Sequence, residues 1–273
     1  VIAAMSIEQM GAVLLAFEGL SILSLLLQKK RIPAVIWIQT AITFVAFVIL
    51  FMAPGNEMRV ASEITTWMPG YKELSVGNHL FMTIQWMLSS FANDGKAFFI
   101  AIWAAGFLLL MKSKKAKVYQ ILTVVFSVAA ILPYAGISFF SEMGIGDIDI
   151  EQCLMELPTW QSMTTQNRIA FFWWIAAVLF TLVLLWKVTG HSVFISMVFL
   201  GGIASEAVLY FSPTIYASGA RVYYLTDLMY LFIILWMVMR MDSEKKKNLF
   251  IAGTAALGVI NFLSQYSIML LKL

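Results

Sequence analysis

The sequence predicts an all-α, polytopic transmembrane helical bundle with about eight spans, and three observations lead to this fold class. Of the 273 residues, 61% are hydrophobic and 12% are charged, whereas a soluble domain is typically about 45–50% apolar and about 25% charged. Apolar stretches of membrane-spanning length recur along the chain, and Lys and Arg gather in alternate connections. These features exclude a soluble enzyme and a nucleic-acid binder, and the single Cys153 excludes a disulfide scaffold.

Each span is placed where about 20 consecutive residues are mostly apolar. The third span is short, and the segment 80–92 before it is also apolar. We expect 80–92 to be a re-entrant or interfacial helix on the outer face that turns at 93–95 into the third span; the alternative is one long, kinked helix. The predicted spans are 4–27, 33–53, 97–111, 118–140, 169–187, 192–211, 222–239 and 249–271.

The whole chain, 1–273, is interpreted as a single integral-membrane domain, because it contains neither a linker nor an internal repeat. It begins with Val1, and no apolar stretch behind a basic start resembles a signal peptide. We therefore expect it to be the C-terminal part of a longer chain.

The distribution of Lys and Arg fixes the expected orientation, because cytoplasmic loops are enriched in both residues. Four short connections hold 12 of the 18 Lys and Arg residues: 28–31, 112–117, 187–191 and 240–247. We expect these four to be cytoplasmic. The longer connections 54–80 and 141–168 would then lie outside, where they are long enough to fold over the membrane face.

Four acidic residues fall within predicted spans, where an ionisable side chain usually faces a polar cavity or a partner. Glu8 and Glu206 lie near the outer ends of their spans, Asp227 lies one to two turns into the seventh, and Glu18 lies near the middle of the first. Such carboxylates either line a site or fix helix packing. We expect Glu206 to line a polar cavity.

The segment Pro54-Gly55-Asn56-Glu57-Met58-Arg59 lies directly at the outer end of the second span. Pro and Gly favour a turn there, and Asn is a good N-cap. Unpaired backbone N–H groups beside a guanidinium favour a phosphate site. The alternative is a helix-ending turn with an Arg that reaches the membrane surface.

A second turn, 212–221, joins the sixth and seventh predicted spans on the same face and places Arg221 at the start of a helix. Arg at that position opposes the helix dipole and needs an anion. We expect Arg59 and Arg221 to hold one phosphate together. His79, Asp94 and Lys96 add polarity on the same face, although Lys96 is also typical of a membrane-surface anchor.

Three stretches, IEQMGAVLLAFEG (7–19), MAPGNEMR (52–59) and YFSPTIYASGARVYY (210–224), give the chain a family resemblance. It resembles bacterial multipass membrane proteins of cell-surface polysaccharide assembly, which are similar to the GT-C class of glycosyltransferases. The resemblance implies an outward-facing site that transfers a sugar from a polyprenyl-phosphate donor to a glycan or lipid-linked acceptor. It implies one wall of Pro54, Gly55, Asn56 and Arg59 and another of Ser212, Pro213 and Arg221.

In that class the catalytic Asp or Glu follows the first span, and here the corresponding loop would precede Val1. Glu8 and Glu206 are therefore the fallback candidates for the base, and His79, Lys96 and Asp227 complete the candidate substrate-binding residues. No cofactor or metal-ligand motif is present, and a divalent metal at the phosphate is left open. The predicted partners are the lipid donor, the acceptor and membrane lipids, in a bacterial plasma membrane. The alternatives are a transporter or flippase of lipid-linked glycans, and a polysaccharide polymerase or ligase.

Overall fold

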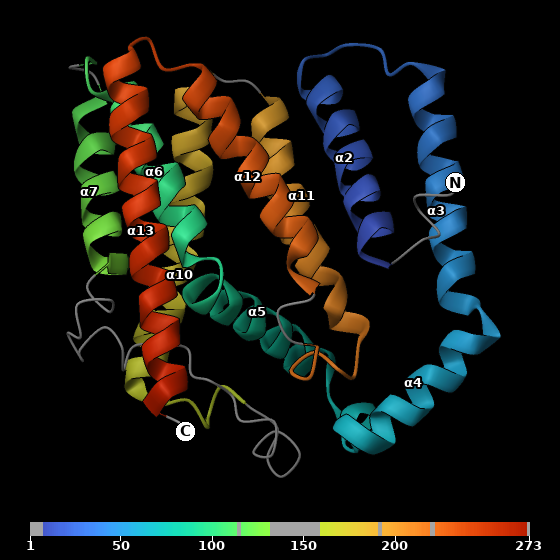
Figure 1. Ribbon diagram of the computed structural model, residues 1–273. Coiled ribbons are helices and arrows are strands. Elements are labelled where there is room, and N and C mark those ends of the chain that lie inside the picture. The colour runs from blue at the N-terminus through green and yellow to red at the C-terminus, as the bar shows by residue number, and fades with distance from the viewer. Residues whose placement is uncertain (1–7, 114–115, 132–158, 191–192, 219–221, 272–273) are drawn as a thin grey trace. The chain divides into compact units, whose positions relative to one another are not determined.

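The structure is a computed structural model that describes residues 8–113, 116–131, 159–190, 193–218 and 222–271, and all regular elements in these ranges are helical (Figure 1). The all-α prediction is therefore confirmed for this part of the chain. The helices are α2 (Glu8–Leu27), α3 (Ala34–Met52), α4 (Pro54–Trp67), η1 (Tyr71–Glu73), α5 (Val76–Asn93), α6 (Lys96–Leu110), α7 (Lys117–Ile131), α10 (Thr165–Val188), α11 (Val193–Ala207), η4 (Val208–Phe211), α12 (Tyr224–Met239) and α13 (Glu244–Leu271).

Among the described residues, four helices are long and apolar enough to cross a membrane: α2, α3, α10 and α11 extended by η4. The pair α5 and α6 counts as a fifth if it forms one bent span. Each of the eight predicted ranges contains a helix, but α12 is shorter than a full span, and residues 132–140 of the fourth predicted range lie outside the described residues. Four to five candidate spans are consistent with an integral membrane protein.

The break between α5 and α6 falls at the predicted position. The backbone N–H groups of Asp94 and Gly95 both donate to the carbonyl of Ser90, at 2.9 Å each. A Cβ at Gly95 would lie 3.3 Å from the Cα of Phe91, so the tight approach of the two backbones favours glycine. The helix axes bend by 69° there, which fits either a broken span or a re-entrant segment.

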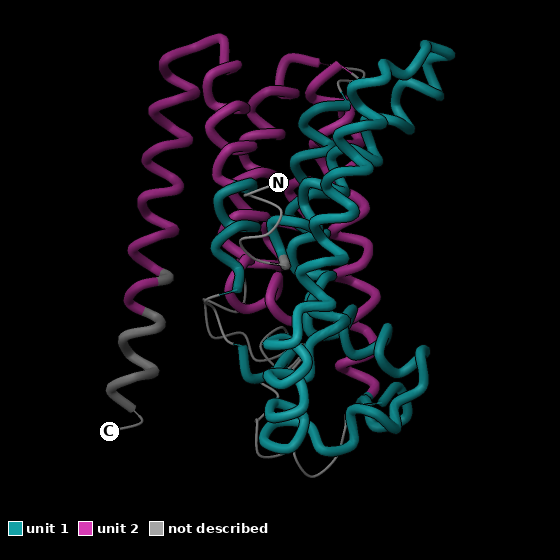
Figure 2. The backbone as a smooth tube through the Cα atoms, turned by 90° about the vertical axis from the view of Figure 1, so that its right-hand side faces the viewer, with its two compact units in different colours: residues 1–88, 147–164, 193–230 teal, residues 89–146, 165–192, 231–273 magenta. Residues whose placement is uncertain are grey.

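The chain forms two compact units, coloured separately in Figure 2. Unit 1 comprises 1–88, 147–164 and 193–230, and unit 2 comprises 89–146, 165–192 and 231–273. Neither unit is a continuous stretch of chain, and the interpretation of 1–273 as one membrane domain stays a prediction.

In unit 1, α2 packs against both α3 and α11 (Figure 1). A Cβ at Gly201 would lie 2.7 Å from Cε2 of Phe17, so glycine allows α11 to approach α2 closely. On the other face of α2, Thr43 Oγ1 donates a 2.8 Å hydrogen bond to Oε1 of buried Glu18. Glu18 therefore serves the packing of α2 and α3, which is the structural alternative considered for it above.

In unit 2, an aromatic core joins α6, α7 and α10. Trp103 is fully buried, and its indole N–H donates a 2.8 Å hydrogen bond to Thr181 Oγ1 on α10. Its ring centroid lies 5.5 Å from that of Phe126 on α7. These contacts pack three helices around one side chain.

Two of the predicted cytoplasmic turns of unit 2 are linked through Asp242. Its carboxylate accepts hydrogen bonds from Lys112, at 2.8 Å, and forms an ion pair with Lys246, at 2.9 Å. The hydrogen bonds from Lys112 and Lys246 lower the pKa of Asp242 from 3.8 to about 2. Asp242 is therefore ionised at neutral pH, and the α6–α7 and α12–α13 turns lie at the same end of this unit.

Candidate functional site

Unit 1 contains a pocket of about 1040 Å³. The helices that line it meet at the end of the unit opposite the α2–α3 turn (Figure 1). Its walls come from the ends of α2 and α3, from α4 and η1, and from the chain between α11 and α12. The predicted turns 54–59 and 212–221 thus both contribute to one pocket. Its polar and charged lining residues are Gln9, Asn56, Glu57, Arg59, Glu63, Lys72, Ser212, Thr214 and Ser218.

The first wall begins where α3 ends. Ala53 has an extended backbone and Pro54 is the first residue of α4, so a new helix starts after a single residue. The expectation that Asn56 caps this helix is wrong, because Asn56 already lies inside its first turn. Its side-chain amide instead donates a 2.8 Å hydrogen bond to the carbonyl of Leu50 in the last turn of α3. Asn56 therefore fixes the angle between α3 and α4.

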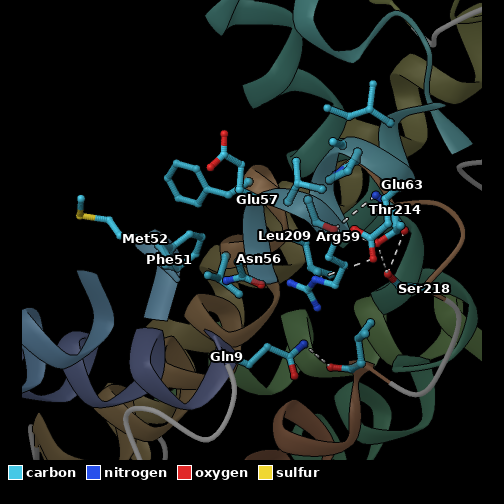
Figure 3. A pocket seen from close by; sticks show the side chains of 18 of the residues that line it. Gln9, Phe51, Met52, Asn56, Glu57, Arg59, Glu63, Leu209, Thr214 and Ser218 are labelled. Carbon is cyan, nitrogen blue, oxygen red and sulfur yellow. Dashed lines mark hydrogen bonds and ion pairs between the residues drawn. The ribbon is translucent and has the colours of Figure 1, made fainter. Parts of the chain in front are cut away.

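Arg59 lies one turn further along α4 and is half-exposed. Figure 3 shows its side chain in the pocket, with Asn56 on one side and Glu63, Thr214 and Ser218 on the other. Arg59 Nε lies 3.9 Å from Glu63 Oε1, a separation too long for a strong hydrogen bond. Lys72 in η1 is a second cation in the lining. The pocket thus holds two cations and two carboxylates, Glu57 and Glu63.

The opposite wall presents a set of hydroxyl groups. Ser212 Oγ lies 2.8 Å from Thr214 Oγ1, which in turn lies 3.3 Å from Ser218 Oγ. Ser218 Oγ also donates a 2.8 Å hydrogen bond to the carbonyl of Thr214. Hydroxyls both donate and accept hydrogen bonds, so this wall suits a polyhydroxylated or phosphorylated ligand.

The two walls are held together by an apolar cluster and by polar contacts behind it. The cluster includes Leu209, which also lines the pocket. Tyr71 donates a 3.3 Å hydrogen bond to the carbonyl of Tyr210. The pKa of the Tyr71 hydroxyl is raised, mainly by burial and to a smaller extent by the neighbouring Tyr210. The Tyr71 hydroxyl therefore stays protonated as a donor. The buried residues of the cluster are Met68, Met82, Trp86, Leu209, Ile215 and Tyr223.

The start of α2 closes the remaining side. The amide of Gln9 is buried and donates a 2.8 Å hydrogen bond to the carbonyl of Val222, just before α12. This contact joins residues 213 positions apart in the sequence. Gln9 therefore anchors α2 to the second wall while it lines the pocket.

Several predicted site residues lie near the pocket without lining it. Pro54 and Gly55 form the exposed first turn of α4. His79, on α5, has its Nε2 3.2 Å from the carbonyl of Tyr71, and its ring contacts those of Tyr71 and Tyr210. His79 therefore packs against Tyr71 of η1 and Tyr210 of η4 without lining the pocket.

The other predicted residues are placed differently. Glu206 is 1% exposed in α11, and both it and half-buried Asp227 of α12 lie within electrostatic range of the Tyr230 hydroxyl. Glu206 is not among the residues that line the pocket, so the cavity it was expected to face is not this one. Lys96 begins α6 in unit 2. Arg221 and the side chain of Glu8 lie outside the described residues.

Sequence reasoning named Ser212 but missed the other polar residues of the lining, which are Glu57, Glu63, Lys72, Thr214 and Ser218. The periodicity of α4 would have helped, because Glu63 lies four residues after Arg59 and therefore on the same helix face. Where described, no group of three or more His, Cys, Asp or Glu side chains is placed to hold a metal ion.

No family model, no curated protein and no solved structure matches this chain.

Proposed function

We propose that the protein is a bacterial plasma-membrane glycosyltransferase that takes a sugar from a polyprenyl-phosphate donor at the outer face of the membrane. The observation that carries the proposal is the pocket in which Asn56 and Arg59 of the PGN-x-x-R segment lie opposite Ser212 and Thr214 of the later Ser-Pro segment. A donor of this class combines a phosphate, a sugar and an apolar tail, and each needs a different kind of surface.

The cations of the pocket suit the phosphate. A guanidinium binds a phosphate through two parallel hydrogen bonds, and Lys72 supplies a point charge on the same lining. The 3.9 Å separation of Arg59 from Glu63 is long and the Arg59 side chain is about half-exposed, so the guanidinium is accessible to a phosphate. The hydroxyls of Ser212, Thr214 and Ser218 then face the sugar.

Transfer also requires a base. The bond between the sugar's anomeric carbon and the phosphate oxygen breaks, the acceptor oxygen bonds to that carbon, and the acceptor hydroxyl gives its proton to a carboxylate. Glu57 lines the pocket, is exposed and forms no ion pair with any described residue. We assign this role to Glu57 in preference to Glu206, which is buried away from the lining, and Glu8 stays the second candidate.

A transfer assay tests the proposal. We expect the purified chain in lipid vesicles to transfer sugar from a polyprenyl-phosphate donor to an acceptor glycan. We expect Glu57→Gln to lose turnover while it still binds polyprenyl phosphate, and Glu73→Gln, an exposed carboxylate outside the pocket, to behave as wild type. Movement of the intact donor across the vesicle, without cleavage of the sugar–phosphate bond, would identify a flippase and refute the proposal.

The proposal includes eight spans with 54–80 outside and 112–117 in the cytoplasm. In a Cys153→Ser background, we expect Ser62→Cys, on the exposed face of α4, to react with an impermeant maleimide in intact cells. Lys115→Cys should react only after permeabilisation. The reverse pattern would overturn the orientation, and with it an outward-facing pocket.

A further inference from the structure

Unit 2 contains an apolar groove of about 440 Å³ between α6, α7 and α13. The polar side chains in its lining are Thr123, Ser127 and Thr254, and two of these hydroxyls are already satisfied. Thr123 Oγ1 donates to the carbonyl of Gln120, at 2.7 Å, and Thr254 Oγ1 donates to that of Phe250, at 2.9 Å. The groove is therefore suited to a hydrocarbon chain rather than to a polar ligand.

The groove is open where glycine lines it. A Cβ at Gly253 of α13 would meet no heavy atom within 4 Å. Val124 and Val128 of α7 and Leu249 of α13 also line the groove and are about half-exposed or more. Exposed apolar residues on membrane helices face lipid, so a lipid chain has direct access to the groove.

Basic residues lie at one end of each of the three helices that form the groove, beyond its apolar lining. Lys112 follows α6, Lys117 begins α7, and Lys245 to Lys247 lie in the first turn of α13 (Figure 1). The bonds of Asp242 to Lys112 and Lys246 hold two of these helix ends together. Lys117 and Lys245 are exposed and form no hydrogen bond or ion pair with any described residue. Lys247 pairs with Glu244 at 2.8 Å, so Lys117 and Lys245 are the two lysines at these helix ends whose charge no described carboxylate compensates.

We propose that this groove is a binding site for an anionic glycerophospholipid, with one acyl chain between α6, α7 and α13 and the headgroup phosphate at Lys117 and Lys245. The charge of the lysines favours an anionic over a zwitterionic headgroup, and the basic turns are those predicted to face the cytoplasm, where anionic lipids attract such clusters. The site is independent of the proposed transferase pocket.

Lipid titration of the purified full-length chain, followed by native mass spectrometry, tests the site. We expect phosphatidylglycerol to bind more tightly than phosphatidylcholine with the same chains. Replacing Lys117 and Lys245 together by Gln should weaken phosphatidylglycerol binding roughly 25-fold, since each lysine near a membrane surface contributes about five-fold. Lys30→Gln with Arg31→Gln, in the basic turn of unit 1, should have little effect on this site.

A matched pair of glycines tests the chain-binding part. Gly253→Leu should fill the groove and abolish tight binding, whereas Gly258→Leu, on the same helix and with equal space but outside the lining, should not. Helicity and melting temperature check that each variant folds. If Gly253→Leu does not fold, the variant with Lys117 and Lys245 replaced by Gln is the deciding test of the lipid site. Equal affinity for both phospholipids, unchanged binding by Gly253→Leu, or displacement of phosphatidylglycerol by a lower concentration of polyprenyl phosphate would each overturn the proposal.

Discussion

Arg59→Lys is expected to weaken polyprenyl-phosphate binding by roughly 10- to 150-fold while the protein stays folded. Charge-assisted hydrogen bonds of the kind a guanidinium makes to phosphate are worth about 1.5–3 kcal/mol, and about 1.4 kcal/mol corresponds to ten-fold in affinity. Lys keeps the charge but cannot form the parallel pair of bonds. Binding of a polyprenyl phosphate to the purified variant, followed by fluorescence or calorimetry, measures the change.

Arg31→Lys is the matched control, because Arg31 is exposed in the α2–α3 turn, at the opposite end of unit 1 from the pocket. We expect it to bind the lipid as wild type does. An Arg that only anchors α4 at the membrane surface would be replaced by Lys without loss, since both side chains extend to the interface equally well. Wild-type affinity of Arg59→Lys would therefore refute the phosphate role.

Trp103→Ala is expected to destabilise the protein by about 3–5 kcal/mol, the usual cost of removing a large buried aromatic ring. Trp103 is fully buried between α6, α7 and α10, and its replacement leaves a cavity beside Phe99 and Phe126. The loss persists in a bilayer, because helix association there depends on close packing rather than on exclusion of water. Unfolding in mixed micelles, followed by circular dichroism, measures the free energy.

Two further variants define the cause. Trp103→Phe keeps a ring but loses the 2.8 Å bond to Thr181, so we expect a smaller loss, about 0.5–1.5 kcal/mol for the bond plus a packing contribution. Trp186 of α10 is 40% exposed, and Trp186→Ala should cost less still. A Trp103→Ala protein as stable as Trp186→Ala would contradict the packing of unit 2 described here.

The helical class was predictable because apolar residues dominate whole stretches of chain, as in α3. In lipid, a helix pairs the backbone N–H and C=O groups of such a stretch with one another. The break at 93–95 was also predictable, since Asn-Asp-Gly interrupts an apolar run. The starts of α10 and α13 were not, since these helices begin at Thr165 and Glu244, four and five residues before the predicted spans. Hydropathy alone does not specify the first residue of a helix, because polar residues can extend it beyond the apolar run.

The site was predictable only in part. Asn56 and Arg59 stand out because they follow a proline at the end of a span, and both line the pocket. Glu63 and Lys72 belong to a segment that reads as a connection, yet it folds into α4 and η1. Their positions depend on contacts between residues far apart in sequence, such as that of Tyr71 with Tyr210, which a local pattern does not contain.

The joint between α3 and α4 has a consequence for the response of the protein to the thickness of its bilayer. α3 has 19 residues and, at about 1.5 Å per residue, is close to the thickness of the hydrocarbon layer, about 30 Å. A thinner or thicker layer changes the tilt of such a helix. Ala53 alone separates α3 from α4, and Asn56 of α4 donates a hydrogen bond to the carbonyl of Leu50 in α3. A tilt of α3 therefore moves α4, and with it Arg59. The chain length of the surrounding lipids would thus regulate the distance between Arg59 and the hydroxyl wall.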